Sequence, residues 1–125
     1  MSARGLAGLL AAGRATLGVA ILAAPEKVTV HWLGHENARL PVVGDLARSL
    51  GARDLALGIA MLATLKDPAA GSRVQAACAA VDTVDAIATV AARAALPRKG
   101  VIATVAVAGG CAAAGAQLSR RLARV

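Results

Sequence analysis

The sequence predicts an all-α integral membrane protein, a four-helix bundle with an amphipathic, Trp-anchored connection between helices 1 and 2. The 125-residue chain is 58% hydrophobic, with a mean hydropathy of +0.65, so it holds more apolar surface than a soluble domain of this size can bury. Its apolar residues fall into four blocks of about 17–25 residues, the length that crosses a bilayer. We expect a single transmembrane domain over residues 1–125, with helices at about 5–24, 43–65, 74–95 and 101–118.

Two other classes fit the composition less well. A soluble alanine-rich bundle would have amphipathic helices with charged outer faces, which the last two blocks lack. The net charge is +7 and Trp32 is the one aromatic residue. A nucleic-acid-binding protein would cluster its basic side chains on one face or offer aromatic rings for stacking. Here the basic residues lie at block ends and in loops, which indicates contact with anionic lipid headgroups and no nucleic-acid partner.

The first block has the length of a secretory signal peptide, with Ala23 and Ala24 as a possible cleavage site. Arg14, however, interrupts the run that a signal peptide keeps apolar. We therefore expect a retained helix that Pro25 ends. The Arg14 side chain has two interpretations: it extends along the lipid to the headgroups, or it turns inward towards acidic residues of other helices.

The connection from Pro25 to Leu50 is the one long polar stretch of the chain. Trp32 predicts an anchor at headgroup level, where amphipathic rings gather. His31, His35 and Glu36 lie near it; they are more simply solvated or interfacial than metal ligands, and we expect no metal and no cofactor. Gly34 and the β-branched residues before it disfavour a helix there. A helical pattern returns at residues 42–50 and extends the second block backwards.

The second and third blocks carry the charges that are out of place in lipid. Arg53 and Asp54 lie in the second block, where Gly58 predicts a close helix contact. Asp82 and Asp85 lie near the middle of the third, three residues apart and hence on one helix face. An aspartate at mid-bilayer costs about 2.5–3.5 kcal/mol. Both carboxylates must therefore face the bundle interior or a water-filled cavity.

A charge network follows from the expected antiparallel packing of the second and third helices. We expect the Arg53 guanidinium to reach one carboxylate of the third helix, in bidentate geometry. Thr64, Thr83 and Thr89 could donate further hydrogen bonds. With one arginine against three carboxylates, at least one carboxyl would be protonated, and an inward Arg14 would change that balance. The network either forms a functional site or only fixes helix register.

The fourth block offers small residues at four-residue spacing, Gly109 to Ala113 and Gly110 to Ala114, which suggest tight packing against a neighbour. Cys78 and Cys111 lie inside apolar blocks and are expected to act as small buried apolar residues; a disulfide would require that the third and fourth helices touch there. Four spans place both termini on one side, and the arginine-rich tail favours the cytoplasm.

Three stretches carry a resemblance to a known group of proteins: the end of the first block, LAAPE; the segment GARDLALGIAML; and the DTVD of the third helix. The chain resembles small four-helix actinobacterial membrane proteins of unknown function, loosely similar to DoxX-like proteins. The resemblance implies the four-helix topology and the importance of Arg53, Asp54 and Gly58 and of the two acids Asp82 and Asp85. It implies no reaction.

Three functions are compatible with this sequence. The first is a membrane protein whose network of Arg14, Arg53, Asp54, Asp82 and Asp85 lines a site for a small or lipid-like ligand, or for a partner helix. The second is a membrane enzyme in which an intramembrane aspartate acts as general acid or base on a lipid-soluble substrate; the absence of Phe and Tyr disfavours a carbocation cyclase. The third is an accessory subunit of a membrane complex, or a homo-oligomer.

Overall fold

The computed structural model describes residues 1–125 and contains only helices and short turns. The helices are α1 (Ala3–Ala23), α2 (Pro25–Ala38), α3 (Pro41–Ala63), α4 (Pro68–Ala91) and α5 (Arg98–Leu122), with a 3-10 turn at Arg93–Ala95. The predicted all-α class is therefore confirmed. Three of the helices, α1, α4 and α5, are long and apolar enough to cross a membrane.

Prolines and capping side chains explain where the helices begin. Pro25, Pro41 and Pro68 open α2, α3 and α4, at the position where the missing N–H has no intrahelical partner to lose. Asp67 caps α4 by accepting a hydrogen bond from the Ala70 N–H at 3.0 Å. The helix starts expected at residues 43, 74 and 101 lie a few residues after the observed starts of α3, α4 and α5. Hydropathy marks the apolar middle of a helix and misses its polar first turn.

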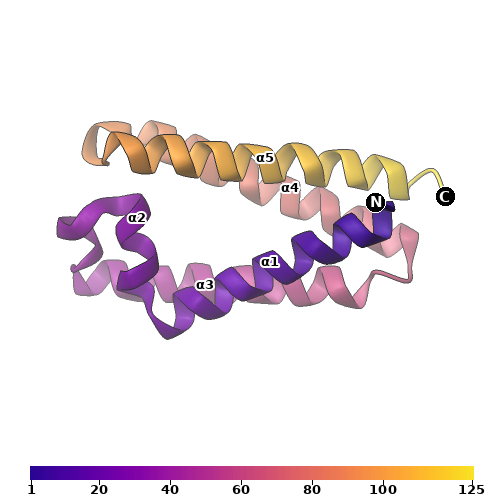
Figure 1. The fold of residues 1–125 in the computed structure, drawn as a ribbon, viewed down its shortest axis with the longest axis horizontal. Helices are drawn as coiled ribbons and strands as arrows, with labels where there is room; N and C mark the ends of the chain where they lie inside the picture. The colour runs from indigo at the N-terminus through magenta and orange to yellow at the C-terminus, as the bar shows by residue number, and fades with distance from the viewer.

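The helices form two antiparallel pairs that face each other. One pair consists of α1 packed along α3, and the other of α4 packed along α5, whereas contacts between the pairs are sparser (Figure 1). Helix α2 lies across one end, in contact with α1, α3 and α5. Both termini lie at the opposite end (Figure 1), which is the arrangement expected of four antiparallel long helices.

Small residues allow the close approach within the α1–α3 pair. A Cβ at Gly58 would stand 2.7 Å from the backbone nitrogen of Ala15, and one at Gly18 would stand 2.6 Å from the carbonyl oxygen of Gly51. Real side-chain carbons do not approach so closely, so only glycine fits at these crossings. The close contact predicted at Gly58 is therefore present, and its partner is α1.

In the α4–α5 pair the close contact lies at Gly115, whose added Cβ would come within 3.3 Å of Ala79. The contact expected around Gly109 and Gly110 is absent from this chain. A Cβ at either position meets nothing within 4 Å, because both glycines lie on the outward face of α5. That expectation was wrong for packing inside the chain.

The connection expected after Pro25 is mostly helical, although the sequence disfavours a helix around Gly34. Helix α2 accommodates the unfavourable residues by breaking at Gly34, whose φ of 80° and ψ of 166° are outside the helical region. Few residues other than glycine adopt that conformation. The backbone of Trp32 packs directly against Gly100 at the start of α5, so α2 turns back over the bundle end, and the half-buried Trp32 ring lies inside the fold.

The exterior of the long helices is strongly apolar. Only 21 of 125 residues are buried, and many large apolar side chains are exposed, among them Leu9, Val84, Ile87, Ile102 and Val107. A soluble protein rarely leaves so continuous an apolar surface. Helix α3 differs from the other long helices because any 18-residue stretch of it contains Arg48, Arg53 and Asp54.

Candidate functional site

Arg14 projects from the middle of α1 into the space between the two helix pairs. Its side chain is only 11% exposed, so the choice left open by the sequence is resolved: the guanidinium turns inward and does not extend along the exterior. Its Nη1 donates to Asp54 Oδ1 on α3 at 3.1 Å. Its Nη2 donates to both carboxylate oxygens of Asp82 on α4. Arg14 thereby joins three helices.

Arg53 makes the second connection between the pairs. Its Nη1 and Nη2 donate to Asp85 Oδ1 and Oδ2 at 3.0 and 2.7 Å, the parallel two-bond geometry that suits a guanidinium and a carboxylate. The same side chain returns to its neighbour, with Nε and Nη2 at 3.3 and 3.1 Å from Asp54 Oδ1. Of the two carboxylates on α4, Arg53 therefore binds Asp85, and Arg14 binds Asp82.

These five residues form one chain of alternating charge: Asp85, Arg53, Asp54, Arg14, Asp82. All three bonds that Asp54 accepts end on Oδ1, which leaves its Oδ2 without a donor. Two guanidinium groups face three carboxylates, so the formal charge of the cluster is −1. We call this set the charge chain. It contains the five residues that the sequence analysis placed in the charge network, with Asp54 at its centre.

The threonines expected to support the network do not join it. The hydroxyls of Thr64, Thr83 and Thr89 donate to the backbone carbonyls of Ala60, Ala79 and Asp85, each four residues back in the same helix. A threonine in a helix commonly satisfies its hydroxyl in this way, and spacing alone does not distinguish it from a donor to another helix.

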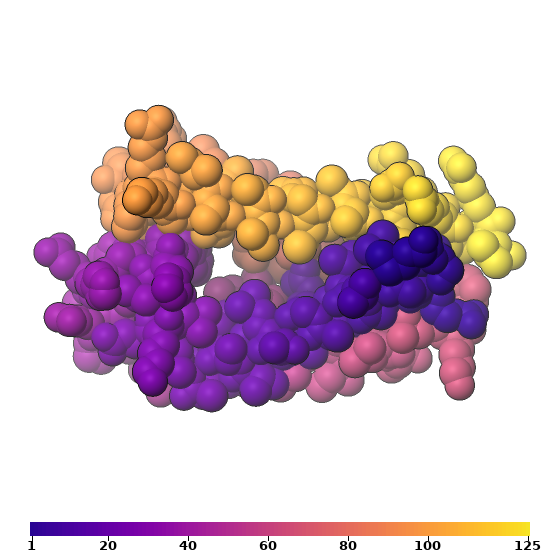
Figure 2. Space-filling model, in the orientation of Figure 1, coloured from indigo at the N-terminus to yellow at the C-terminus, as the bar shows by residue number.

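A cavity of about 500 Å³ lies between the helix pairs, and the charge chain forms part of its wall. All five helices line it. Leu10, Leu17 and Ile21 come from α1, Val28 from α2, and Val107 from α5, while Arg14, Asp54, Asp82 and Asp85 supply the charges. Figure 2 shows the surface hollowed between α5 and α1, next to α2. The cavity is thus apolar along most of its wall and charged at mid-length.

Two further polar groups of the cavity wall have no partner. Trp32 Nε1 and Gln75 Oε1 are the buried side-chain atoms that form no hydrogen bond, and both residues line the cavity. Gln75 is 3% exposed. A buried acceptor without a donor costs about 1–3 kcal/mol. The sequence analysis missed Gln75, although its place seven residues before Asp82, on the same face of α4, was a usable signal.

Both cysteines line the cavity as free thiols, with Cys78 buried and Cys111 half-buried. The disulfide considered from the sequence is therefore not formed. At the end of the bundle, His31, His35 and Glu36 are all exposed. No group of three or more histidine, cysteine or acidic residues has a geometry that could hold a metal ion.

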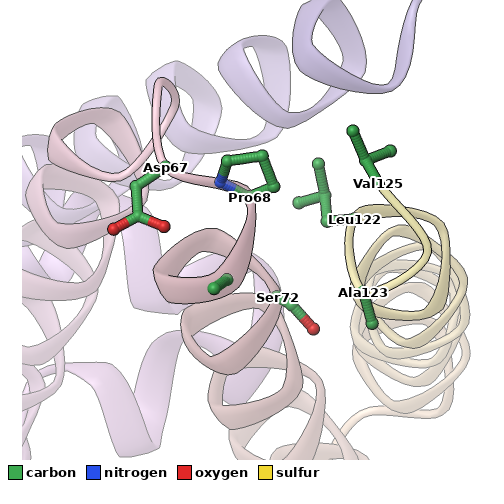
Figure 3. Close-up of a pocket in the computed structure, with 7 residues that line it drawn as sticks. Asp67, Pro68, Ser72, Leu122, Ala123 and Val125 are labelled. Carbon is green, nitrogen blue, oxygen red and sulfur yellow. The ribbon is translucent and has the colours of Figure 1, made fainter.

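A second hollow, of about 480 Å³, lies where α4 begins and α5 ends (Figure 3). Its polar groups are already engaged. Asp67 caps α4, and the Ser72 hydroxyl, which points towards α5 in Figure 3, donates to the Ser119 carbonyl at 2.9 Å. This hollow therefore lacks the unpartnered groups that distinguish the central cavity.

The central cavity offers three kinds of contact to a bound molecule: its apolar walls take hydrocarbon, its carboxylates and the Gln75 amide oxygen accept hydrogen bonds, and the Trp32 Nε1–H donates one. The resemblance to the small actinobacterial membrane proteins stays an expectation and assigns no role to any of these residues. Comparison of the chain with protein-family models, with curated proteins and with solved structures found no match.

Proposed function

We propose that this chain is a multi-pass protein of the cell membrane, with α1, α3, α4 and α5 as spans, that binds a small lipid-like ligand in its central cavity. The observation that carries the proposal is the cavity of about 500 Å³ with the charge chain in its wall. Sites for small molecules commonly occupy about 300–1,000 Å³ and combine apolar walls with a few placed polar groups.

The apolar exterior supports membrane insertion. Helices α1, α4 and α5 meet the length and hydropathy of spans. Helix α3 spans in this proposal because Arg53 and Asp54 turn inward, where their charges find partners on α1 and α4. A charged side chain inside a bilayer is tolerated when it faces the bundle interior and pairs. Helix α2 then lies at the membrane surface at the end away from the termini.

The sparse contact between the two helix pairs supports ligand binding over a purely architectural role. A network that only fixed helix register would stand in a closed, dry core with each polar group satisfied. Here the two pairs are joined by the charge chain but leave space beside it. Asp54 Oδ2 and Gln75 Oε1 still lack donors.

Native mass spectrometry of the protein purified from membranes tests the proposal. We expect a bound lipid-like molecule on the wild-type protein and its loss from Ala108→Leu, which fills the cavity from the buried wall of α5. Ala106→Leu is the matched control, since Ala106 lies two residues away on the exposed face of α5. A wild-type protein that carries no bound molecule, or equal retention by both variants, would contradict the proposal.

The enzyme alternative is favoured by one observation: Asp82 and Asp85 line the cavity, so a bound substrate would reach them. One of these carboxyls would then act as general acid or base on a lipid-soluble substrate. Turnover of a candidate substrate that persists in both Asp82→Asn and Asp85→Asn would remove this alternative. Copurification with a stable partner would instead support an accessory subunit or a homo-oligomer.

A further inference from the structure

The charge chain is one cation short, and this shortage indicates what the cavity binds. Three carboxylates and two guanidinium groups leave one negative charge without a counter-charge. The side chains of Arg14, Asp54 and Asp82 are about nine-tenths buried. The Arg53 and Asp85 side chains are about one-third exposed, so water screens part of the extra charge, and its cost is smaller than the several kcal/mol of a fully buried charge. A positively charged group placed beside the chain would remove that cost.

The missing partner has a definite position. Asp85 and Asp82 have both oxygens occupied by Arg53 and Arg14. Asp54 receives all of its hydrogen bonds on Oδ1, and it lines the cavity. Its Oδ2 is the one carboxylate oxygen of the chain that has no donor. An N–H group of a bound molecule can fill that place.

The shape of the cavity restricts the rest of the molecule. On α5 the lining extends from Ala103 to Gly115, a rise of about 18 Å at 1.5 Å per residue. A volume of about 500 Å³ spread over that length is a narrow slot. Its apolar side chains, such as Leu17, Ile21 and Val107, lie along the slot beside the charges. Because the charges lie at mid-length, an unbranched hydrocarbon chain whose head lies beside them has about 9 Å of slot on either side. A longer chain leaves the slot beside Val107, which lines the cavity and is also exposed.

From these observations we propose that the ligand is a lipophilic amine, a single-chain amphiphile with a protonated amine head that donates to Asp54 Oδ2. The inference rests on the proposed function and adds the chemical class of the ligand. The ammonium group brings the cluster to formal neutrality, and its N–H groups meet the carboxylate oxygen that has no donor, Asp54 Oδ2. A carboxylate head would add a second uncompensated charge and is excluded from the site.

Three probes with one tail and different heads test the inference: oleylamine, oleyl alcohol and oleic acid. The protein is reconstituted in nanodiscs with each probe over the same series of concentrations in the bilayer, as a Cys78→Ala variant so that Cys111 is the one thiol. Cys111 lines the cavity and is half-buried, so an occupied cavity slows its reaction with a small maleimide. We expect oleylamine to protect Cys111 at a concentration about tenfold or more below oleyl alcohol, as one charge-assisted hydrogen bond would give, and oleic acid not to protect.

Asp54→Asn supplies the matched test of the head group. It keeps an oxygen for the arginines and makes the cluster neutral, so we expect oleylamine to lose its advantage while oleyl alcohol is unaffected. Asp45→Asn, on the exposed part of the same helix, should leave the preference for the amine unchanged. If Asp54→Asn does not fold, the ranking of the three probes on the Cys78→Ala protein still tests whether the cavity prefers an amine head.

The outcomes separate this inference from the proposed function. Equal or stronger protection by the alcohol or the acid overturns the amine head and leaves a lipid-binding cavity. Absence of protection by every probe, together with no bound molecule in native mass spectrometry, overturns both.

Discussion

At the scale of single residues, Asp54 Oδ1 holds the charge chain together. It accepts from Arg14 Nη1 and from Arg53 Nε and Nη2, at 3.1–3.3 Å, so one oxygen links the two arginines. Each arginine also has a carboxylate of its own on α4. The network therefore tolerates the loss of a carboxylate better than the loss of a guanidinium.

This asymmetry gives a test by substitution. Arg14→Met leaves one guanidinium against three carboxylates, and we expect it to lower the free energy of unfolding by about 3–5 kcal/mol, the usual cost of breaking a buried ion pair. Asp54→Asn leaves two of each: it weakens the bonds to Oδ1 but removes the excess negative charge, so the two effects oppose each other and we expect a net change of about 1 kcal/mol or less. Unfolding in detergent, followed by circular dichroism, measures both.

Asp45→Asn is the control for the loss of an aspartate on α3, since its pair with Arg48 is exposed and contributes about 0–1 kcal/mol. If Asp54→Asn proved as damaging as Arg14→Met, the count of charges would not govern the stability of the cluster.

At the residue scale the sequence supplied the members of the network but not their pairing. Arg14, Arg53, Asp54, Asp82 and Asp85 stand out because charges are rare in apolar blocks. Which arginine meets which aspartate depends on helix rotation and depth, and these depend on packing at other positions. Gln75 was missed because a single uncharged polar residue in a helix gives a weak signal.

At the scale of helices, the glycine crossings decide which helices pair. Gly58 lets α3 touch α1 at Ala11 and Ala15, with no room for a side chain. Gly110, on the outer face of α5, meets nothing within 4 Å. A side chain at position 58 would therefore push α1 and α3 apart, whereas one at position 110 would meet no neighbour in the chain.

We expect Gly58→Ala to lower the free energy of unfolding by about 1–3 kcal/mol, since overpacking forces the helices apart. Gly110→Ala should leave stability equal or slightly higher, because alanine favours the helix. Thermal unfolding of both variants in one detergent measures the difference. Equal midpoints would contradict the close α1–α3 crossing.

The break in α2 requires glycine at position 34. A side chain there would require an unfavourable backbone at φ 80° and would stand 2.9 Å from Pro97 Cγ. We expect Gly34→Ala to cost about 1–3 kcal/mol, the usual strain of such a conformation. Gly44→Ala is the control, since an added Cβ there meets only the Arg48 side chain, at 3.9 Å. A Gly34→Ala protein as stable as this control would mean that α2 is a continuous helix.

Local preference predicted the long helices well because each carries its own hydrophobic run. It failed at α2, where Gly34 and the β-branched residues disfavour a helix but packing against the start of α5 stabilises one. Tertiary contact outweighs propensity in such a segment.

At the scale of the whole molecule, the status of α3 decides the topology. If α3 spans with α1, α4 and α5, the termini lie on one side of the membrane, as they lie at one end of the bundle in Figure 1. If only the three strongly apolar helices span, the termini lie on opposite sides.

Reporter fusions at each terminus distinguish these cases. We expect fluorescent-protein and alkaline-phosphatase fusions to place both ends on the same side, in the cytoplasm, because Arg120, Arg121 and Arg124 stand beside the last helix. Opposite reports from the two ends would remove the four-span arrangement. A fusion after Arg39, beyond α2, serves as the control and should report the other side.

The sequence could predict the number of long helices and their antiparallel order, but it expected α3 and α4 to pack together, and their contact is sparse. It could not predict that α1 pairs with α3 and α4 with α5, because hydropathy is nearly uniform around these alanine-rich helices and does not indicate which faces meet. The cavity was out of reach for the same reason, since it arises where the two pairs do not close on each other.

The central claim is that the space between the helix pairs is a binding site, and a structure in lipid nanodiscs tests it most directly. We predict an elongated non-protein density in the slot between α1 and α5, with its polar end beside Asp54 and its length along Leu17 and Val107. A dry interface between the pairs, with every charge of the network paired inside the chain and no density in the slot, would contradict the account.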